Sequence, residues 1–175
     1  TAPIGSGFKQ ILLVGLGNKD QVLTDIEWQN IGGNALQKAV ESLKKVPAIN
    51  LDSSSYQAAN FAFGAKLASY YFDKYYTDQE RHKHQQQITI VTQKSTEANQ
   101  YYSSELEPVA NAVWLTRNMS NEPANVIYPE SFVSQWTEHF KGLDNIKIHV
   151  FDENDMLKNN MGAIYGVGRG SKRPP

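Results

Sequence analysis

The sequence contains no cysteine, and this absence excludes several kinds of chemistry at once. Without thiols there is no thiolate nucleophile, no disulfide and no cysteine-ligated metal site. A disulfide-stabilised scaffold is therefore excluded, and a reducing compartment is the plainest interpretation.

The chain also lacks an excess of charge of either sign. Seventeen Lys and Arg residues nearly balance eighteen Asp and Glu residues, which gives a formal net charge of -1. Because this balance supplies no overall basic field, we expect nucleic acid not to be a partner.

Long apolar runs are missing as well. No run approaches the ~18–20 residues that span a bilayer, so we expect no membrane partner. The opening segment Thr1–Gly7 has neither the charged nor the apolar region of a signal peptide. It also lacks an initiator Met, so we expect the chain to begin inside a longer one.

What is present suits one domain, or one domain and part of another: 175 residues, of which 40% are hydrophobic. The apolar run Ile11–Val14, within Lys9–Leu16, predicts a strand buried on both faces. Thr24 and Glu27 form a capping-box pattern that predicts the start of a helix. Apolar residues then recur at helical spacing, at Trp28, Ile31, Ala35, Ala39 and Leu43.

A short strand, a second helix and another strand are predicted next. The strands are Ala48–Leu51 and the β-branched Ile88–Thr92, and Thr77–Gln87 is a polar loop. Ser53–Ser55 offers N-cap candidates for the helix between them. One face of that helix carries small or apolar residues: Ala58, Phe61, Ala62, Ala65, Ser69 and Phe72.

The second half continues the alternation of helices and strands. A helix is predicted over Glu97–Met119, and Pro108 either kinks it or sits in the first turn of a separate helix. Asn121–Asn125 ends it. We then expect a helix from Pro129 to Phe140 ended by Gly142, a strand Ile146–Phe151, a helix Asp152–Asn159 and an extended Met161–Val167. Such alternation predicts an α/β sheet.

Two glycine-rich segments are candidates for phosphate or anion binding. Gly166–Ser171 resembles a phosphate loop faintly, but it runs into Lys172–Pro175, which cannot open a helix, so a turn between strands is favoured. Gly15–Gly17 closes a predicted strand before a capped helix, where free N–H groups gather. Turn geometry alone also explains glycines at that place.

The remaining polar candidates have simpler structural explanations. His82 and His84 lack a third metal ligand, and His139 and His149 are isolated. The acidic cluster suits a helix N-terminus without any catalysis; it comprises Asp152, Glu153 and Asp155.

Three further features carry no clear chemistry. Glu122 lies beside Pro123 in no recognised catalytic pattern, and the Asn118 sequon lies in a predicted helix. The aromatic cluster Tyr70–Tyr76 is interpreted as core or subunit interface rather than a base-stacking surface. No nucleophile elbow or metal-ligand constellation stands out, so the residues alone indicate a soluble α/β domain without a readable function.

Two segments resemble the leucine (cytosol) aminopeptidase family. Thr116–Glu130, with Asn-Glu-Pro-Ala-Asn at 121–125, is similar to the end of the family's interdomain helix. Met161–Pro175 is similar to a family stretch that runs from Met-Gly to Gly-Ser and Pro-Pro. Leu13–Gly17 and Phe72–Tyr75 resemble weaker signatures of its N-terminal domain. Tyr128 departs from the usual N-cap, and Pro108 is unexpected in the interdomain helix.

The resemblance implies a fold and a domain division. Residues 1–107 would be a macro-like N-terminal α/β domain, incomplete at its start. Residues 108–127 would be an interdomain linker helix. Residues 128–175 would be the first helix and strands of a truncated α/β catalytic peptidase domain.

The resemblance also implies a function for the full-length protein: a cytoplasmic, hexameric metallo-aminopeptidase that releases N-terminal residues from peptide substrates. Two divalent ions, Zn or Mn, would polarise the scissile carbonyl and activate a water. The motifs that carry the family's ligands, Asp-Ser-Gly-Gly and Asn-Thr-Asp-Ala-Glu-Gly-Arg, do not occur here. We therefore expect no catalytic, cofactor-binding or metal-ligating residue in this segment, and no peptidase activity from it alone.

One alternative is a nucleotide- or ADP-ribose-binding macro-like module with its site near Gly15–Gly17. Another is a nucleic-acid role, which the charge balance opposes. For Glu130–Pro175 we expect an apolar face without partners, which would drive association or leave that portion disordered.

Overall fold

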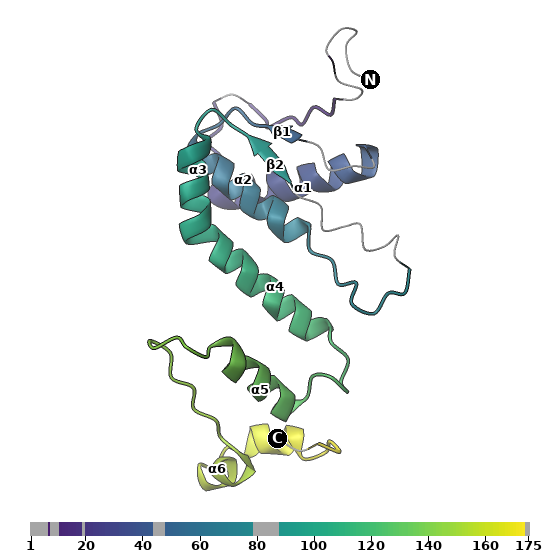
Figure 1. The fold of residues 1–175 in the computed structure, drawn as a ribbon, viewed down its shortest axis with the longest axis vertical. Helices are drawn as coiled ribbons and strands as arrows, with labels where there is room; N and C mark the ends of the chain where they lie inside the picture. Colours follow the sequence, from purple (N-terminus) through teal and green to yellow (C-terminus); the bar gives the residue numbers. More distant parts are fainter. Residues whose placement is uncertain (1–6, 8–10, 19, 44–47, 79–87, 174–175) are drawn as a thin grey trace. The chain divides into compact units, whose positions relative to one another are not determined.

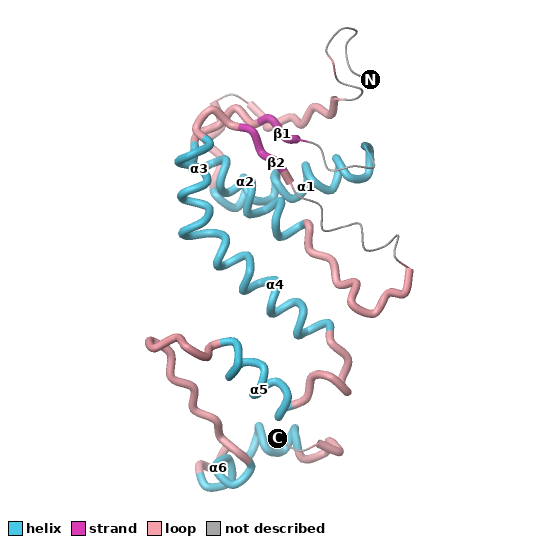
Figure 2. The backbone as a smooth tube through the Cα atoms, viewed as in Figure 1, coloured by secondary structure: helices cyan, strands magenta, loops and turns pink. Residues whose placement is uncertain are grey.

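The computed structural model describes residues 7, 11–18, 20–43, 48–78 and 88–173 (Figure 1). The chain divides into two compact units, Thr1–Asn118 and Met119–Pro175, which are treated separately below. Helices dominate the described residues, and two short strands accompany them (Figure 2). The fold is mixed and rich in helix, as an α/β class allows.

Helix α1 (Asp25–Leu43) begins at the predicted capping box. The Glu27 carboxylate accepts hydrogen bonds from the Thr24 backbone N–H at 2.7 Å and from the Thr24 hydroxyl at 2.8 Å. The Thr24 backbone N–H, and then its hydroxyl, lower the pKa of Glu27 below 4.5. Along the predicted apolar face, Trp28, Ala35 and Ala39 are buried. The helix start and this face are therefore confirmed, while the Leu43 side chain lies outside the described residues.

Strands β1 (Ala48–Asn50) and β2 (Thr89–Val91) flank helix α2 (Ser55–Ala68) in a parallel β-α-β unit. Ile49 faces Ile90 in the register, and the Leu51 backbone N–H donates to the Val91 carbonyl at 2.9 Å. Both strands lie where the sequence predicts them. Parallel strands need a crossover of this kind, and α2 supplies it.

Ser54 is the N-cap of α2, as the serine cluster predicts. Its hydroxyl accepts from the Gln57 backbone N–H at 3.2 Å, and the Gln57 side-chain carbonyl accepts from the Ser54 backbone N–H at 3.0 Å. The helix ends at Ala68 with Ser69 as its C-cap. The predicted face therefore stops short of Phe72, which follows in an irregular segment.

Helices α1 and α2 cross at glycines. A side chain at Gly32 would collide with the Phe61 carbonyl, and one at Gly64 would collide with the Gln29 carbonyl. Beside this crossing the buried Asn60 amide accepts from the Gln29 side chain at 2.8 Å, which satisfies a polar group in the interior. The two backbones approach this closely because Gly32 and Gly64 have no side chain.

The segment from Ser95 to Asn121 is helical throughout, but one π-helical turn interrupts its α-helical geometry. Helix α3 (Ser95–Tyr101) passes into a π-helical turn, η2 (Tyr102–Leu106), and then into α4 (Glu107–Asn121). Pro108 is the second residue of α4, immediately after the π turn. Proline cannot donate to the helical ladder and its ring crowds the preceding turn, so a local widening accommodates it. Of the two predicted alternatives, the structure agrees with the second: Pro108 lies in the first turn of α4, which follows the π-helical turn without a gap.

The core of the first unit lies between the two strands and helices α1, α2 and α3. It is a cluster of buried side chains joined by partly buried neighbours that include Leu16 and Ile31. The cluster comprises Trp28, Ala35, Leu51, Ala58, Phe61 and Ala98.

The buried strand predicted at Lys9–Leu16 is wrong for its described part. Residues 11–18 form no strand, and Leu13 is 88% exposed. Leu16 alone of this segment packs against the core cluster. A strand needs a hydrogen-bonded neighbour, and no described residue pairs with Ile11–Val14. Lys9 lies outside the described residues.

The second unit contains helices α5 (Pro129–His139), α6 (Glu153–Lys158) and α7 (Gly162–Gly168). Pro129 opens α5, and the Ser131 hydroxyl accepts from the Tyr128 backbone N–H at 2.9 Å. This bond supports a helix start at which Tyr128 is a poor cap. Gly142, with φ at 86°, follows the end of α5 as predicted.

Two predictions in the second unit are wrong. Ile146–Phe151 alternates like a strand but forms none, and all six residues are exposed, because no described residue pairs with them. Met161–Val167 is not extended, since α7 occupies it, and the Tyr165 backbone N–H donates to the Met161 carbonyl at 3.1 Å. The described part of residues 128–175 therefore contains helices and no strands. Among the helices that the structure describes, none is both long and apolar enough to cross a membrane.

Candidate functional site: a pocket between α2, β2 and α4

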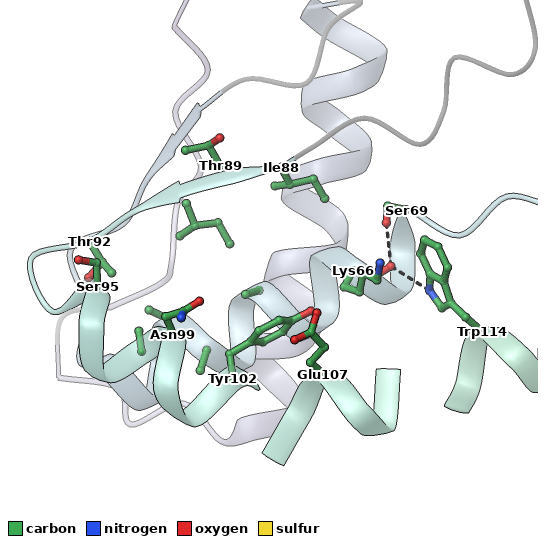
Figure 3. Close-up of a pocket in the computed structure, with 15 residues that line it drawn as sticks. Lys66, Ser69, Ile88, Thr89, Thr92, Ser95, Asn99, Tyr102, Glu107 and Trp114 are labelled. Carbon is green, nitrogen blue, oxygen red and sulfur yellow. Dashed lines mark hydrogen bonds between the residues drawn. The ribbon is translucent and has the colours of Figure 1, made fainter. Parts of the chain in front are cut away.

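A cavity of about 700 Å³ lies within the first unit (Figure 3). Its walls come from α2, from the edge formed by Ile88–Thr92, and from the continuous helical segment that contains α3, η2 and α4. Pockets of this size hold small molecules in many proteins. The cavity is therefore a candidate binding site.

The apolar part of the wall is made chiefly of alanine. Ala58, Ala59 and Ala62 contribute from α2, and Ala98 contributes from α3. Three of these four alanines are nearly fully buried, with exposed fractions of 1% to 7%. Short side chains leave space between α2 and the strand edge, which longer residues would fill.

Polar groups occupy the end of the pocket near α4. Tyr102 and Glu107 end close together in Figure 3, and Lys66 lies beside Trp114. Burial, together with the negative charge of Glu107, raises the pKa of Tyr102. The Tyr102 hydroxyl is therefore protonated and able to donate a hydrogen bond throughout the physiological pH range.

Helix α4 is tied to the last turn of α2 at this end of the pocket. The Trp114 indole N–H donates to the Lys66 carbonyl at 3.2 Å, and Arg117 donates to the Leu67 carbonyl at 2.7 Å. The Lys66 ammonium lies 3.9 Å from the centre of the Trp114 ring, a cation–π contact. Helix C-termini leave carbonyls without intrahelical partners, and Trp114 and Arg117 supply donors for two of them.

The chemistry of these side chains suits binding rather than bond breaking. The lining residues include one lysine and one glutamate but no histidine or cysteine. No serine or threonine among them has a base arranged in the manner of a hydrolase. The pocket offers one positive group, one negative group, several neutral hydrogen-bonding groups and an apolar wall.

The structure does not place Gly15–Gly17 as an anion site. Gly17 adopts a positive φ of 91°, but residues 11–16 before it form no strand, and α1 begins only at Asp25. The first turn of α1 carries Asp25 and Glu27, whose charges oppose an anion there. The geometry required by the nucleotide alternative is therefore absent from the described residues.

The other predicted candidates that the structure describes are not among the residues that line the pocket. Gly166 and Gly168 lie in α7, so the turn predicted between strands is wrong. The acidic cluster caps α6, where the Asp152 carboxylate accepts from the Asp155 backbone N–H at 2.9 Å. His139 contacts Trp136 edge-on at 5.9 Å between ring centres. The other histidines are His149, which is exposed, and His82 and His84, which lie outside the described residues.

The aromatic cluster Tyr70–Tyr76 extends from the end of α2. Tyr70 contacts Trp114 edge-on at 5.7 Å, and Tyr71 stacks on Tyr76 at 5.8 Å between ring centres. Asn118 is exposed near the end of α4, and Glu122 is partly buried just after it.

The described residues do not form a centre for the metal ions that the resemblance implies. No group of three or more His, Cys, Asp or Glu side chains lies close enough there to hold an ion. No step of the chemistry is therefore assigned to a metal within this part of the chain.

Sequence reasoning missed the pocket and its polar residues Lys66, Tyr102, Glu107 and Trp114. Two signals were visible: the run of small residues along α2, and Pro108 following an acidic residue. Neither reveals that α2 and α4 meet across a cavity, because that meeting depends on tertiary contacts.

Comparison with known families matches both ends of the chain. The N-terminal domain of the cytosol aminopeptidase family matches residues 1–79. The catalytic domain of the cytosol aminopeptidase family matches residues 114–175. The order of the two matches is that of the resemblance described above.

Curated proteins give the same match along almost the whole chain. A probable cytosol aminopeptidase from Phytoplasma mali (strain AT) is 35% identical over 98% of this chain and 35% of its own length. One from Rhizobium etli (strain ATCC 51251) is 35% identical over 99% of this chain and 36% of its own length. The chain thus spans about a third of the length of these relatives.

A solved structure shares the fold. The bottromycin maturation enzyme BotP superposes with a TM-score of 0.61, over 86% of this chain and 32% of that protein. Its sequence identity is 18%, so the likeness concerns the fold alone.

Proposed function

The chain belongs to the cytosol aminopeptidase family, and from this premise we propose that it is part of a metal-dependent aminopeptidase that releases amino acids from the N-termini of peptides. The observation that carries the proposal is the pair of family matches, to the N-terminal domain and then to the catalytic domain. Whole-chain similarity to curated probable cytosol aminopeptidases supports it.

Within that enzyme we propose three parts for this segment. Residues 1–107 are an N-terminal domain of macro-like fold, 108–127 are an interdomain linker, and 128–175 are the beginning of the catalytic domain. The parallel β1–α2–β2 unit supports an α/β N-terminal domain. The hydrogen bonds from Trp114 and Arg117 to α2 support a linker held firmly to that domain.

We further propose that peptide cleavage needs residues other than those present here. The two motifs that carry the family's metal ligands, as the resemblance implies them, do not occur in this sequence. Two divalent ions, Zn or Mn, would be bound by those motifs and would supply the Lewis acid and the activated water. The residues of this segment would contribute to assembly into a homo-oligomer, a hexamer in the resembling family, in the cytoplasm.

The test compares the 175-residue chain with the longest product of its gene. With leucine p-nitroanilide and added Mn²⁺ or Zn²⁺, the longest product is expected to release nitroaniline, to lose this activity with a chelator and to regain it with metal. The 175-residue chain is expected to show no turnover above a heat-treated control. Turnover that co-purifies with the 175-residue chain through two columns would contradict the assignment of a non-catalytic segment. If the longest product shows no metal-dependent turnover, the proposed aminopeptidase activity is wrong.

A further inference from the structure

Two groups of opposite charge line the pocket. Lys66 and Glu107 both line the cavity, and within the described residues neither takes part in an ion pair. Lys66 contacts only the face of Trp114 through its ammonium, which leaves N–H donors for another acceptor. A ligand that carries one negative and one positive group would complement both residues.

The spacing of the two groups indicates how long that ligand is. Glu107 and Trp114 lie seven positions apart on the continuous helix α4, and a rise of 1.5 Å per residue separates them by roughly 10 Å along the axis. The Lys66 ammonium lies 3.9 Å from the centre of the Trp114 ring, so it marks the far end of this span. An extended chain covers ~3.3–3.6 Å per residue, and two or three residues therefore bridge the gap.

The wall between the charges suits a peptide backbone with small side chains. The alanines of α2 and α3 leave room for methyl-sized groups, and Ser69 and Asn99 line the same cavity.

We propose that the pocket between α2, β2 and α4 binds short peptides of two or three residues with free ends. The Lys66 ammonium receives the C-terminal carboxylate, and the Glu107 carboxylate receives the N-terminal ammonium. Tyr102, whose hydroxyl lies near Glu107, donates to the peptide backbone. This inference goes beyond the proposed peptidase function and does not rest on it, because it concerns binding by this chain alone.

Calorimetry of the 175-residue chain with trialanine tests the inference. Saturable binding is expected, with at least tenfold weaker binding of N-acetyl-trialanine, trialanine amide and free alanine. The acetylated peptide lacks the positive end, the amide lacks the negative end, and free alanine is too short to reach both residues. Chromatography of the titrated peptide reports hydrolysis separately, so absence of cleavage does not affect the binding result.

Two substitutions assign the ends. Lys66→Met is expected to weaken trialanine binding at least tenfold and to remove the preference for trialanine over its amide. Glu107→Gln is expected to weaken trialanine binding at least tenfold and to remove the preference for trialanine over N-acetyl-trialanine. Lys38→Met and Glu41→Gln are matched controls, because those residues form an exposed pair on α1, and they are expected to leave binding unchanged. Lys66→Arg keeps the charge and is expected to retain the preference for the free carboxylate.

Circular dichroism and melting temperature establish that each variant is folded. If Lys66→Met does not fold, Glu107→Gln and the blocked peptides carry the test. The proposal is overturned if trialanine gives no saturable heat at millimolar concentration, if the blocked peptides bind as well as trialanine, or if free alanine matches it. It is also overturned if the substitutions at Lys38 and Glu41 weaken binding as much as those at Lys66 and Glu107.

Discussion

At the scale of single residues, two glycines determine how closely α1 and α2 approach. The Cβ positions of Gly32 and Gly64 are occupied by backbone carbonyls of the opposite helix. Gly166, in α7, has nothing within 4 Å of the same position. Glycine costs roughly 0.5–1 kcal/mol in a helix relative to alanine. At Gly32 and Gly64 the two helices pack too closely for alanine, so glycine is required there despite this cost.

Gly64→Ala is therefore expected to destabilise the first unit, although alanine is the better helix former. The added methyl group must displace the Gln29 carbonyl, and overpacking of this kind costs about 1–3 kcal/mol. Gly166→Ala is the matched control and is expected to be neutral or stabilising by up to about 1 kcal/mol. Urea unfolding followed by circular dichroism measures both values. A Gly64→Ala variant as stable as the parent chain would show that the helices can separate without cost.

At the scale of elements, local hydrogen bonds define where the helices begin. Thr24 with Glu27, Ser54 with Gln57, and Tyr128 with Ser131 each exchange bonds across the first turn or satisfy its free N–H groups. At the other end of α2, Trp114 and Arg117 donate to the last carbonyls, and the Arg117 guanidinium lies 5.4 Å from the centre of the Tyr70 ring.

The start of α1 gives a prediction for pH dependence. Because the folded state lowers the pKa of Glu27, its ionised form contributes stability above the ordinary value of 4.5. That contribution is lost as the pH falls through the lowered pKa. Glu27→Gln, which keeps an acceptor but no charge, is expected to be less stable than the parent chain at pH 7 and to converge with it toward pH 3. A stability difference that does not change between pH 7 and pH 3 would contradict the role of the charge.

Elements fixed by neighbouring residues could be predicted from the sequence, whereas those that need a distant partner could not. The capping boxes and Pro129 place helix starts correctly because the interacting groups lie three residues apart or less. Lys9–Leu16 and Ile146–Phe151 have strand patterns, yet a strand exists only when another segment pairs with it. The pocket depends on contacts between α2 and α4, such as Arg117 with Leu67, which no local pattern encodes.

At the scale of the whole molecule, the two units differ in how much they bury. The core cluster belongs to the first unit, whereas Met119 and Met156 are the buried hydrophobic residues among those described in the second. Large apolar side chains of the second unit stand exposed, among them Phe132, Val150, Phe151, Leu157 and Val167. Association through such surfaces stays a prediction for this part of the chain.

Hydrogen exchange is expected to separate the two units. Amides of α5, α6 and α7 should exchange at least tenfold faster than those of α1 and α2, because few buried contacts hold the second unit closed. Mass spectrometry at dilute concentration, and again at a hundredfold higher concentration, measures this difference. Selective protection of the second unit at the higher concentration would indicate association. Equal protection of both units in the dilute sample would contradict the expectation.

The bonds that complete the end of α2 also have a consequence in time. Trp114 and Arg117 follow their acceptors by 48 and 50 residues. A ribosome that adds 5–20 residues per second needs roughly 2–10 s to synthesise that interval. During synthesis, the bonds from Trp114 and Arg117 therefore form several seconds after the last turn of α2 has been made. The end of α2 is complete only when α4 has been made.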